Sequence, residues 1–135
     1  MVPKKAPPLI CIVDEDESVR QCLDRLIRST GFQTSVFDSA RAFLRSYHPR
    51  KITCLVLDAD LPGAGGLQLQ RTLGAVNIFI PMVLLTAPAD VVRTRELADG
   101  ATEVLRKPFT EGELLNAITR LVRSGRDSLC VQANG

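Results

Sequence analysis

The chain has 135 residues, of which 45% are hydrophobic and 24% are charged, and its formal net charge is +2. This length and apolar content fit one globular domain with its own core. The net charge argues little either way: it is too small, and the basic residues too scattered, to imply nucleic-acid binding, and we expect no direct nucleic-acid partner. Because no apolar run reaches membrane-spanning length and the N-terminus has no signal-peptide core, we expect a cytoplasmic protein without a membrane partner.

Four cysteines are present, but their spacing does not match a metal site or a disulfide framework. Cys11, Cys22, Cys54 and Cys130 form no CxxC pair, and His48 is the only histidine. Two of the cysteines lie inside apolar runs that resemble strands. We therefore interpret the cysteines as small hydrophobic side chains in a reduced compartment, and we expect no zinc.

The first part of the chain alternates between strand and helix patterns. Residues 1–8, rich in Pro and Lys, are predicted to be a disordered leader. Residues 9–13 form a continuous apolar run, which indicates a strand covered on both faces. Apolar residues at helical spacing then predict a helix from Ser18 to about Gly31. Residues 32–37 predict a second strand, of more mixed composition.

The middle of the chain continues the alternation. Ser39 is expected to cap a short helix that ends near Pro49. Residues 52–57 predict a third, strongly apolar strand, and a glycine-rich loop then leads to a helix that carries Leu69 and Leu73. Residues 82–85 predict a fourth apolar strand, which ends at Thr86.

The last third of the chain has weaker patterns at first. Residues 90–99 predict a helix with a thin apolar stripe, and residues 103–106 predict a short mixed strand. Thr110 and Glu113 match a capping box at the start of a strongly amphipathic helix. We expect the domain to cover residues 9–123 and residues 124–135 to form a flexible tail.

Five strands alternating with five helices predict an α/β fold with a parallel sheet and helices on both faces. The first, third and fourth strands are uniformly apolar and favour central positions, whereas the second and fifth are mixed and favour the edges. The (βα)5 doubly wound, flavodoxin-like strand order 2-1-3-4-5 satisfies both demands. It places a ligand crevice between the first and third strands, at their carboxyl ends.

This topology brings polar residues from distant parts of the chain to one rim of the sheet. They follow the first, third, fourth and fifth strands respectively: Asp14 with Glu15, Asp58, Thr86 and Lys107. Three ionised carboxylates about 5 Å apart repel one another by roughly 3 kcal/mol per pair at an effective dielectric near 20. A hard divalent cation would relieve this repulsion, and Mg²⁺ also accepts a backbone carbonyl such as that of Asp60.

Together with a hydroxyl and an ammonium group, these carboxylates are typical of a phosphoryl-transfer centre. Mg²⁺ and Lys107 would neutralise phosphoryl oxygens, and Thr86 would donate a hydrogen bond to them. A carboxylate would attack phosphorus. The predicted nucleophile is Asp58, because it stands alone on the central strand while the acidic pair beside it is free to hold the metal.

Over about residues 9–122, the chain resembles the receiver domain of two-component response regulators, and in particular that of nitrogen-fixation regulators. The matching motifs occur in the family's order and spacing: Val13-Asp14-Glu15, Leu57-Asp58-Ala59-Asp60-Leu61-Pro62-Gly63, Leu85-Thr86-Ala87 and Lys107-Pro108-Phe109.

The resemblance implies that Asp58 accepts a phosphoryl group from a histidine kinase or a phosphotransfer protein. It implies that Glu15, Asp58 and the Asp60 carbonyl bind Mg²⁺ and that Asp14 acts through water. Thr86 would swing toward the phosphoryl group and Lys107 would pair with it.

The resemblance also implies a signalling role rather than conventional enzyme activity. In the family, the Lys107-Pro108 bond is typically cis, and the surface of the fourth helix, fifth strand and fifth helix changes on phosphorylation. Such a protein catalyses at most its own aspartyl phosphorylation and dephosphorylation. A homodimer through the fourth and fifth helices is a further implication.

Three features depart from the family pattern. Glu15 stands where the family usually has Asp, and Val104 stands at the switch position where many receivers carry Tyr or Phe. The segment from Thr86 to Lys107 is about one residue shorter than usual. Pro88, two residues after Thr86, has no side-chain donor to align a hydrolytic water, which predicts slow self-dephosphorylation.

Two alternative functions remain open at this point. A degenerate receiver would act as an interaction domain without accepting a phosphoryl group. A haloacid-dehalogenase-like phosphohydrolase is suggested by Asp58-Ala59-Asp60 after an apolar strand, although that motif normally opens such a fold.

Overall fold

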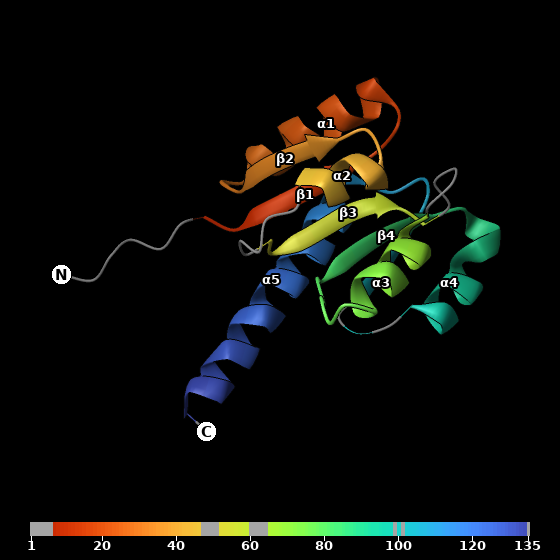
Figure 1. Cartoon of the computed structure of the whole chain (residues 1–135). Coiled ribbons are helices and arrows are strands. Elements are labelled where there is room, and N and C mark those ends of the chain that lie inside the picture. Colours follow the sequence, from red (N-terminus) through yellow and green to blue (C-terminus); the bar gives the residue numbers. More distant parts are fainter. Residues whose placement is uncertain (1–6, 47–51, 60–64, 99, 101, 135) are drawn as a thin grey trace.

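Figure 1 shows a computed structural model of the chain, which describes residues 7–46, 52–59, 65–98, 100 and 102–134, with side chains up to Ser124. The strands are β1 (Leu9–Val13), β2 (Gln33–Phe37), β3 (Cys54–Asp58), β4 (Met82–Thr86) and β5 (Thr102–Arg106). The helices are α1 (Glu17–Arg28), α2 (Ala40–Ser46), α3 (Gly66–Gly74), α4 (Val91–Leu97) and α5 (Glu111–Asn134), with a short 3-10 helix η1 (Pro88–Asp90) before α4.

The sheet is parallel and has the order β2-β1-β3-β4-β5, which confirms the predicted doubly wound topology. Val13 pairs with Leu57, and Leu57 pairs with Leu84, so the three central strands are aligned at their carboxyl ends. At the edge of the sheet, Thr86 pairs with Arg106. The strands with mixed composition, β2 and β5, occupy the two edges, as their sequences predicted.

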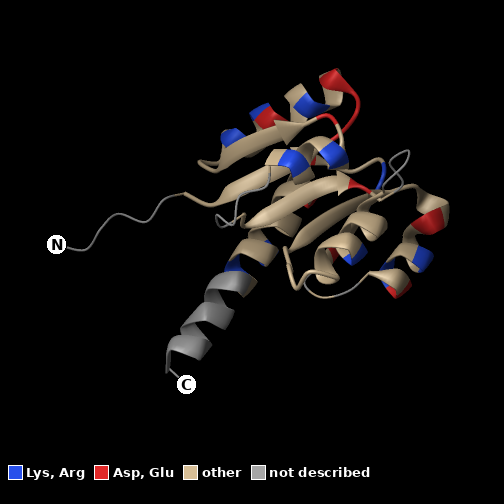
Figure 2. Ribbon diagram, in the orientation of Figure 1, with Lys and Arg blue, Asp and Glu red and all other residues tan. Residues whose placement is uncertain are grey.

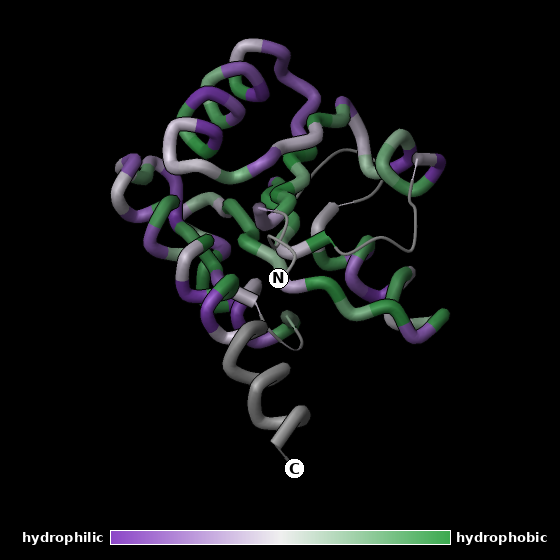
Figure 3. Tube along the Cα trace, turned by 90° about the vertical axis from the view of Figure 1, so that its left-hand side faces the viewer, coloured by the Kyte–Doolittle hydropathy of each residue, from purple (hydrophilic) through white to green (hydrophobic). Residues whose placement is uncertain are grey.

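The sheet separates two apolar clusters, because successive strand residues point to opposite faces. Helices α1 and α5 cover one face, where Ile27 and Ile118 pack against alternate residues of the central strands. Helices α2 and α3 cover the other face with Phe43, Leu69 and their neighbours. Figure 3 shows these strands as a mainly hydrophobic centre surrounded by helices of mixed hydropathy. The central strands are therefore buried on both faces.

Local hydrogen bonds explain where several helices begin. The Asp16 carboxylate accepts from the backbone N–H groups of Ser18 and Val19 at 2.8 and 3.2 Å, so it caps α1. Ser39 Oγ accepts from the Ala42 N–H at 3.0 Å at the start of α2. At α5, the Glu113 N–H donates to Thr110 Oγ1 at 3.1 Å and Glu113 Oε1 accepts from the Thr110 N–H, which confirms the predicted capping box.

The predicted helix over residues 90–99 is shorter in the structure. Helix α4 spans Val91–Leu97, after the 3-10 turn Pro88–Asp90. Pro88 explains the late start, because a proline is tolerated in a first turn and lacks an N–H to continue a ladder. Thr94 is the buried residue of α4, so the thin apolar stripe seen in the sequence corresponds to a weakly packed helix.

Helix α5 continues to Asn134, past residue 123, where we expected the domain to end. The flexibility of the tail stays a prediction. Figure 1 shows this part of the helix projecting away from the sheet. Residues 125–134 contain no proline that would break the helix. At the other end of the domain, the Pro8 carbonyl already accepts from the Gln33 N–H at 3.0 Å. Residues 1–6 of the predicted leader, as well as His48 and Pro49, lie outside the described residues.

The cysteine thiols of the described side chains are unbonded to one another. Cys11 and Cys54 are buried in the sheet, which agrees with their interpretation as small hydrophobic residues, whereas Cys22 is exposed on α1. Burial raises the pKa of Cys11 to about 11 and that of Cys54 to about 12. Both buried thiols are thus neutral at physiological pH. None of the described helices combines the length and apolar character needed to cross a bilayer.

Candidate functional site

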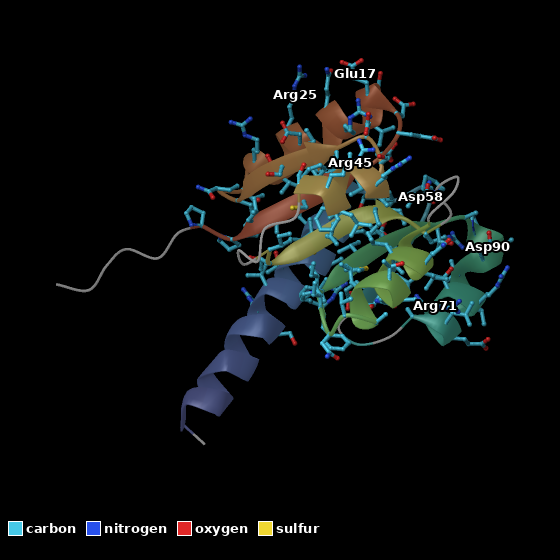
Figure 4. The ribbon with its side chains drawn as sticks, viewed as in Figure 1. Glu17, Arg25, Arg45, Asp58, Arg71 and Asp90 are labelled. Carbon is cyan, nitrogen blue, oxygen red and sulfur yellow. The ribbon has the colours of Figure 1, made fainter. Side chains whose placement is uncertain are left out.

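Asp58 ends the buried strand β3 at the rim of the sheet. The four residues before it are buried, whereas the Asp58 side chain is 21% exposed. The N–H of Ala59 donates to the Leu85 carbonyl at 2.8 Å, so the backbone stays fixed to β4 just beyond the carboxylate. Figure 4 shows Asp58 at the tip of β3. The strand therefore holds this carboxylate rigidly at the boundary between core and solvent.

Lys107 reaches Asp58 from the end of β5. Lys107 Nζ donates a hydrogen bond to Asp58 Oδ2, and the two groups form an ion pair. The Lys107 backbone is held to β4, because its N–H donates to the Thr86 carbonyl at 2.8 Å. The Lys107-Pro108 bond is cis, as the resemblance implied. Both residues lie at the rim, and the ammonium group supplies positive charge directly beside the carboxylate. Pairing of Lys107 with a phosphoryl group stays a prediction.

Asp14 follows β1, the strand next to β3, and lies beside Asp58 because Val13 pairs with Leu57. Asp14 is buried, and its Oδ1 accepts from the Asp16 N–H at 2.9 Å. Arg20 Nη1 donates to the Asp14 carbonyl at 2.7 Å, and the Asp14 N–H donates to the Phe37 carbonyl at 3.1 Å. These bonds hold the β1–α1 connection in one conformation. Sequence reasoning missed Arg20, although its place in the first turns of α1 puts it within reach of the rim.

Glu15 is exposed, and among the described residues no three His, Cys, Asp or Glu side chains form a cluster that could hold a metal ion. Asp60 lies outside the described residues. The donor chemistry nevertheless fits Mg²⁺, which needs only one or two protein carboxylates when waters and phosphate oxygens complete its shell. Asp14 and Asp58 are two carboxylates of this kind at the ends of neighbouring strands. Metal binding by Asp14, Glu15, Asp58 and the Asp60 carbonyl stays a prediction.

Thr86 ends β4 and is fully buried. Its Oγ1 lies 3.3 Å from Oγ1 of Thr94, which belongs to α4 and is 3% exposed. The sequence analysis placed Thr86 at the rim but did not single out Thr94. Thr94 could have been noticed in the sequence, because it is a lone hydroxyl residue eight positions after Thr86, in a helix with few apolar residues. Val104 lies half-buried on β5, where it pairs with Leu84 of β4.

Figure 2 shows that acidic residues mark the β1–α1 connection and the tip of β3. Asp14 and Asp58 thus follow or end neighbouring strands at this rim, and the ammonium group of Lys107 pairs with Asp58. An electronegative rim with one ammonium group suits a divalent cation and a phosphoryl group bound together.

The family model for the response regulator receiver domain matches residues 10–119 of the chain. The chain belongs to this family. The match excludes the haloacid-dehalogenase-like alternative as a description of the fold, and it confirms the family that the motifs around Asp58 and Lys107 indicated.

Three similar proteins show where the chain lies within the family. It is 40% identical over 119 residues to nodulation protein W of Bradyrhizobium diazoefficiens, covering 87% of this chain and 52% of the relative. It is 31% identical over 115 residues to the transcriptional regulatory protein FixJ of the same organism, covering 84% of this chain and 56% of FixJ. The structure of the response regulator StyR superposes with a TM-score of 0.81 at 39% identity, covering 96% of this chain and 66% of that chain. The chain thus spans about half the length of these two curated relatives.

Proposed function

We propose that this receiver domain is a phosphorylation-dependent signalling switch that accepts a phosphoryl group on Asp58 from the phosphohistidine of a histidine kinase or a phosphotransfer protein. The observation that carries the proposal is the pairing of Asp58 with Lys107 beside the buried Asp14. A carboxylate next to an ammonium group, at the edge of a rigid sheet, suits attack on phosphorus more than a purely structural role.

In the proposed step, a carboxylate oxygen of Asp58 forms a P–O bond while the P–N bond of the phosphohistidine breaks. The electron pair of that bond goes to the imidazole nitrogen. Because the other ring nitrogen of the phosphohistidine carries a proton, the histidine leaves as neutral imidazole. The Lys107 ammonium group neutralises the negative charge that develops on the phosphoryl oxygens, and Thr86 donates a hydrogen bond to one of them. Mg²⁺, held by Asp14, Glu15, Asp58 and the Asp60 carbonyl, supplies further neutralisation of these oxygens when bound.

The other proposed properties follow from the same assignment. Phosphorylation would alter the surface formed by α4, β5 and α5, which could also be the contact of a homodimer. We propose a cytoplasmic location, and we propose that this chain does not bind nucleic acid directly, since its net charge is only +2. Catalysis would be limited to its own aspartyl phosphorylation and dephosphorylation.

The test is to incubate the protein with Mg²⁺ and a small phosphodonor such as acetyl phosphate, and to measure intact mass. We expect a base-labile adduct on the wild-type chain and none on Asp58→Asn. Asp38→Asn is a matched control, because Asp38 is an exposed carboxylate that follows β2, the edge strand beyond β1. It should form the adduct as the wild type does.

Other outcomes would point to the alternatives. No adduct despite an intact Asp58 would indicate a degenerate receiver that acts as an interaction domain, as the exposed Glu15 and the Val104 switch position would allow. Steady turnover of phosphate esters would instead indicate a phosphohydrolase. A lasting adduct that survives in Asp58→Asn would show that a different residue is the acceptor.

We further propose that the adduct is long-lived, because Pro88 offers no side-chain donor to align an attacking water. Pro88 is the first residue of η1, two residues after the end of β4. Pro88→Asn should shorten the adduct's lifetime in a mass-based decay assay. An unchanged decay rate would mean that this position does not control hydrolysis.

A further inference from the structure

The hydroxyl contact between Thr86 and Thr94 connects the proposed phosphorylation site to α4. The two Oγ1 atoms lie 3.3 Å apart in the interior, and either can be the donor. Thr94 is the buried residue of α4, whose seven residues are all described. A buried hydroxyl is normally hydrogen-bonded. Each of these hydroxyls therefore serves as a polar partner for the other.

The contact with α4 and the proposed phosphoryl group on Asp58 lie on opposite sides of β4. Asp58 belongs to β3, on one side of β4 in the sheet, whereas α4 packs against β5, on the other side. A hydroxyl has a single hydrogen to donate. Threonine side chains occupy discrete staggered rotamers, so turning the Thr86 hydroxyl toward Asp58 moves it away from the Thr94 hydroxyl. The two contacts of Thr86 thus compete.

The competition has a consequence for α4. When Thr86 turns away, the Thr94 hydroxyl loses its partner in the interior, which is unfavourable. Helix α4 is short and loosely packed, since Val92 and Leu97 are exposed, so it can move to bring the Thr94 hydroxyl to a new partner. Val104 has no aromatic ring to carry the signal through β5. A direct link from Thr86 to α4 would serve in its place.

We propose that Thr94 is a positioning residue, which holds the Thr86 hydroxyl toward α4 in the unphosphorylated protein and releases α4 when Thr86 turns to the phosphoryl group. The proposal rests on the proposed function, because it requires an acceptor at Asp58. It assigns a role to a residue of α4 that touches no reacting atom.

The first measurement is the rate of adduct formation with acetyl phosphate and Mg²⁺. Thr94→Val keeps the shape of the side chain and removes the hydroxyl, so Thr86 is free to turn and the adduct should form about 3- to 10-fold faster. Thr94→Ser keeps the hydroxyl and should behave like the wild type. Thr119→Val is the matched control, because it removes a partly buried helix hydroxyl that bonds within α5, to the Leu115 carbonyl.

The second measurement is one that a merely structural role would not move. In NMR spectra of the unphosphorylated protein, the amide signals of Val91–Leu97 in Thr94→Val should shift toward their positions in phosphorylated wild type. The signals of Thr94→Ser should stay at the unphosphorylated wild-type positions. Thr94→Ala is a second variant without the hydroxyl and should show the same shift if Thr94→Val fails to fold.

The outcomes separate the two proposals. Absence of an adduct on the wild type would overturn the proposed function, and this inference with it. An adduct on the wild type, with equal rates and unshifted α4 signals in Thr94→Val or Thr94→Ala, would overturn the inference alone. A rate increase shared by Thr94→Ser or by Thr119→Val would also overturn it, because the effect would not depend on the Thr94 hydroxyl.

Discussion

The centre of the sheet is more deeply buried than its β5 edge. Strands β1, β3 and β4 are buried on both faces, and their carboxyl ends carry Asp14, Asp58 and Thr86. At the edge, β5 is mostly half-buried, and the helix beside it, α4, is seven residues long with a single buried residue. The proposed chemistry therefore lies on the rigid, closely packed half of the domain. The proposed response lies on the half that is least packed.

The largest effect on stability is expected in the centre. Leu57 is fully buried, directly before Asp58. Leu57→Ala should lower the free energy of unfolding by about 2–5 kcal/mol, because it leaves a cavity between well-packed strands. Urea unfolding followed by circular dichroism measures this change. A loss below 1 kcal/mol would contradict the rigid, close-packed description of the centre.

The next effect concerns the close approach of α3 to the sheet. A Cβ on Gly66 would lie 2.4 Å from Leu84 Cδ2 and 3.3 Å from the Asp58 carbonyl oxygen. Gly66→Ala should therefore destabilise the domain by about 1–3 kcal/mol through overpacking. Gly112→Ala is the control, because a Cβ there meets only Thr110 Oγ1 at 3.9 Å. Equal unfolding midpoints for the two variants would mean that the sheet accommodates the extra methyl group.

The buried thiols test the centre by charge rather than by volume. The folded-state pKa values of Cys11 and Cys54, about 11 and about 12, lie above the ordinary value of 9.0. Above pH 9 the unfolded thiols ionise while the native ones stay protonated, so stability is full below pH 9 and falls as pH rises. The loss is at most about 1.4 kcal/mol per pH unit for each thiol. Urea unfolding between pH 8 and 11 should show a flatter pH dependence in a Cys11→Ala, Cys54→Ala variant than in the wild type.

The smallest effect is expected at the edge. Val92 on α4 is 67% exposed. Val92→Ala should change the free energy of unfolding by less than about 0.5 kcal/mol, since little apolar area leaves or enters water and alanine favours the helix. The same urea assay applies. A loss comparable to that of Leu57→Ala would show that α4 is an integral part of the core, and the contrast between the two regions would disappear.

The sequence predicted most of the architecture because each strand carries its own burial pattern. The uniformly apolar runs before Asp14, Asp58 and Thr86 indicated central strands, and this fixed both the strand order and the rim where the polar residues meet. The capping box at Thr110 could also be predicted, because capping depends on residues close in sequence.

Other features depend on distances that a pattern does not contain. The sequence suggested three gathered carboxylates, but Glu15 is exposed and Lys107 already accompanies Asp58. The contact of Thr94 with Thr86 depends on how α4 lies over β4 and β5, which local periodicity does not specify. The continuation of α5 beyond Arg123 was missed, because the analysis of its apolar stripe followed packing rather than helix propensity.

That continuation turns α5 into an arm. A helix rises 1.5 Å per residue, so residues 125–134 extend about 15 Å beyond the part that packs on the sheet. A tilt of about 10° at the foot of such an arm would displace its far end by about 3 Å, more than a typical side-chain rearrangement within the core. The longest reach of the domain thus belongs to one of the elements proposed to respond, and small changes at the sheet would be largest where α5 is farthest from it.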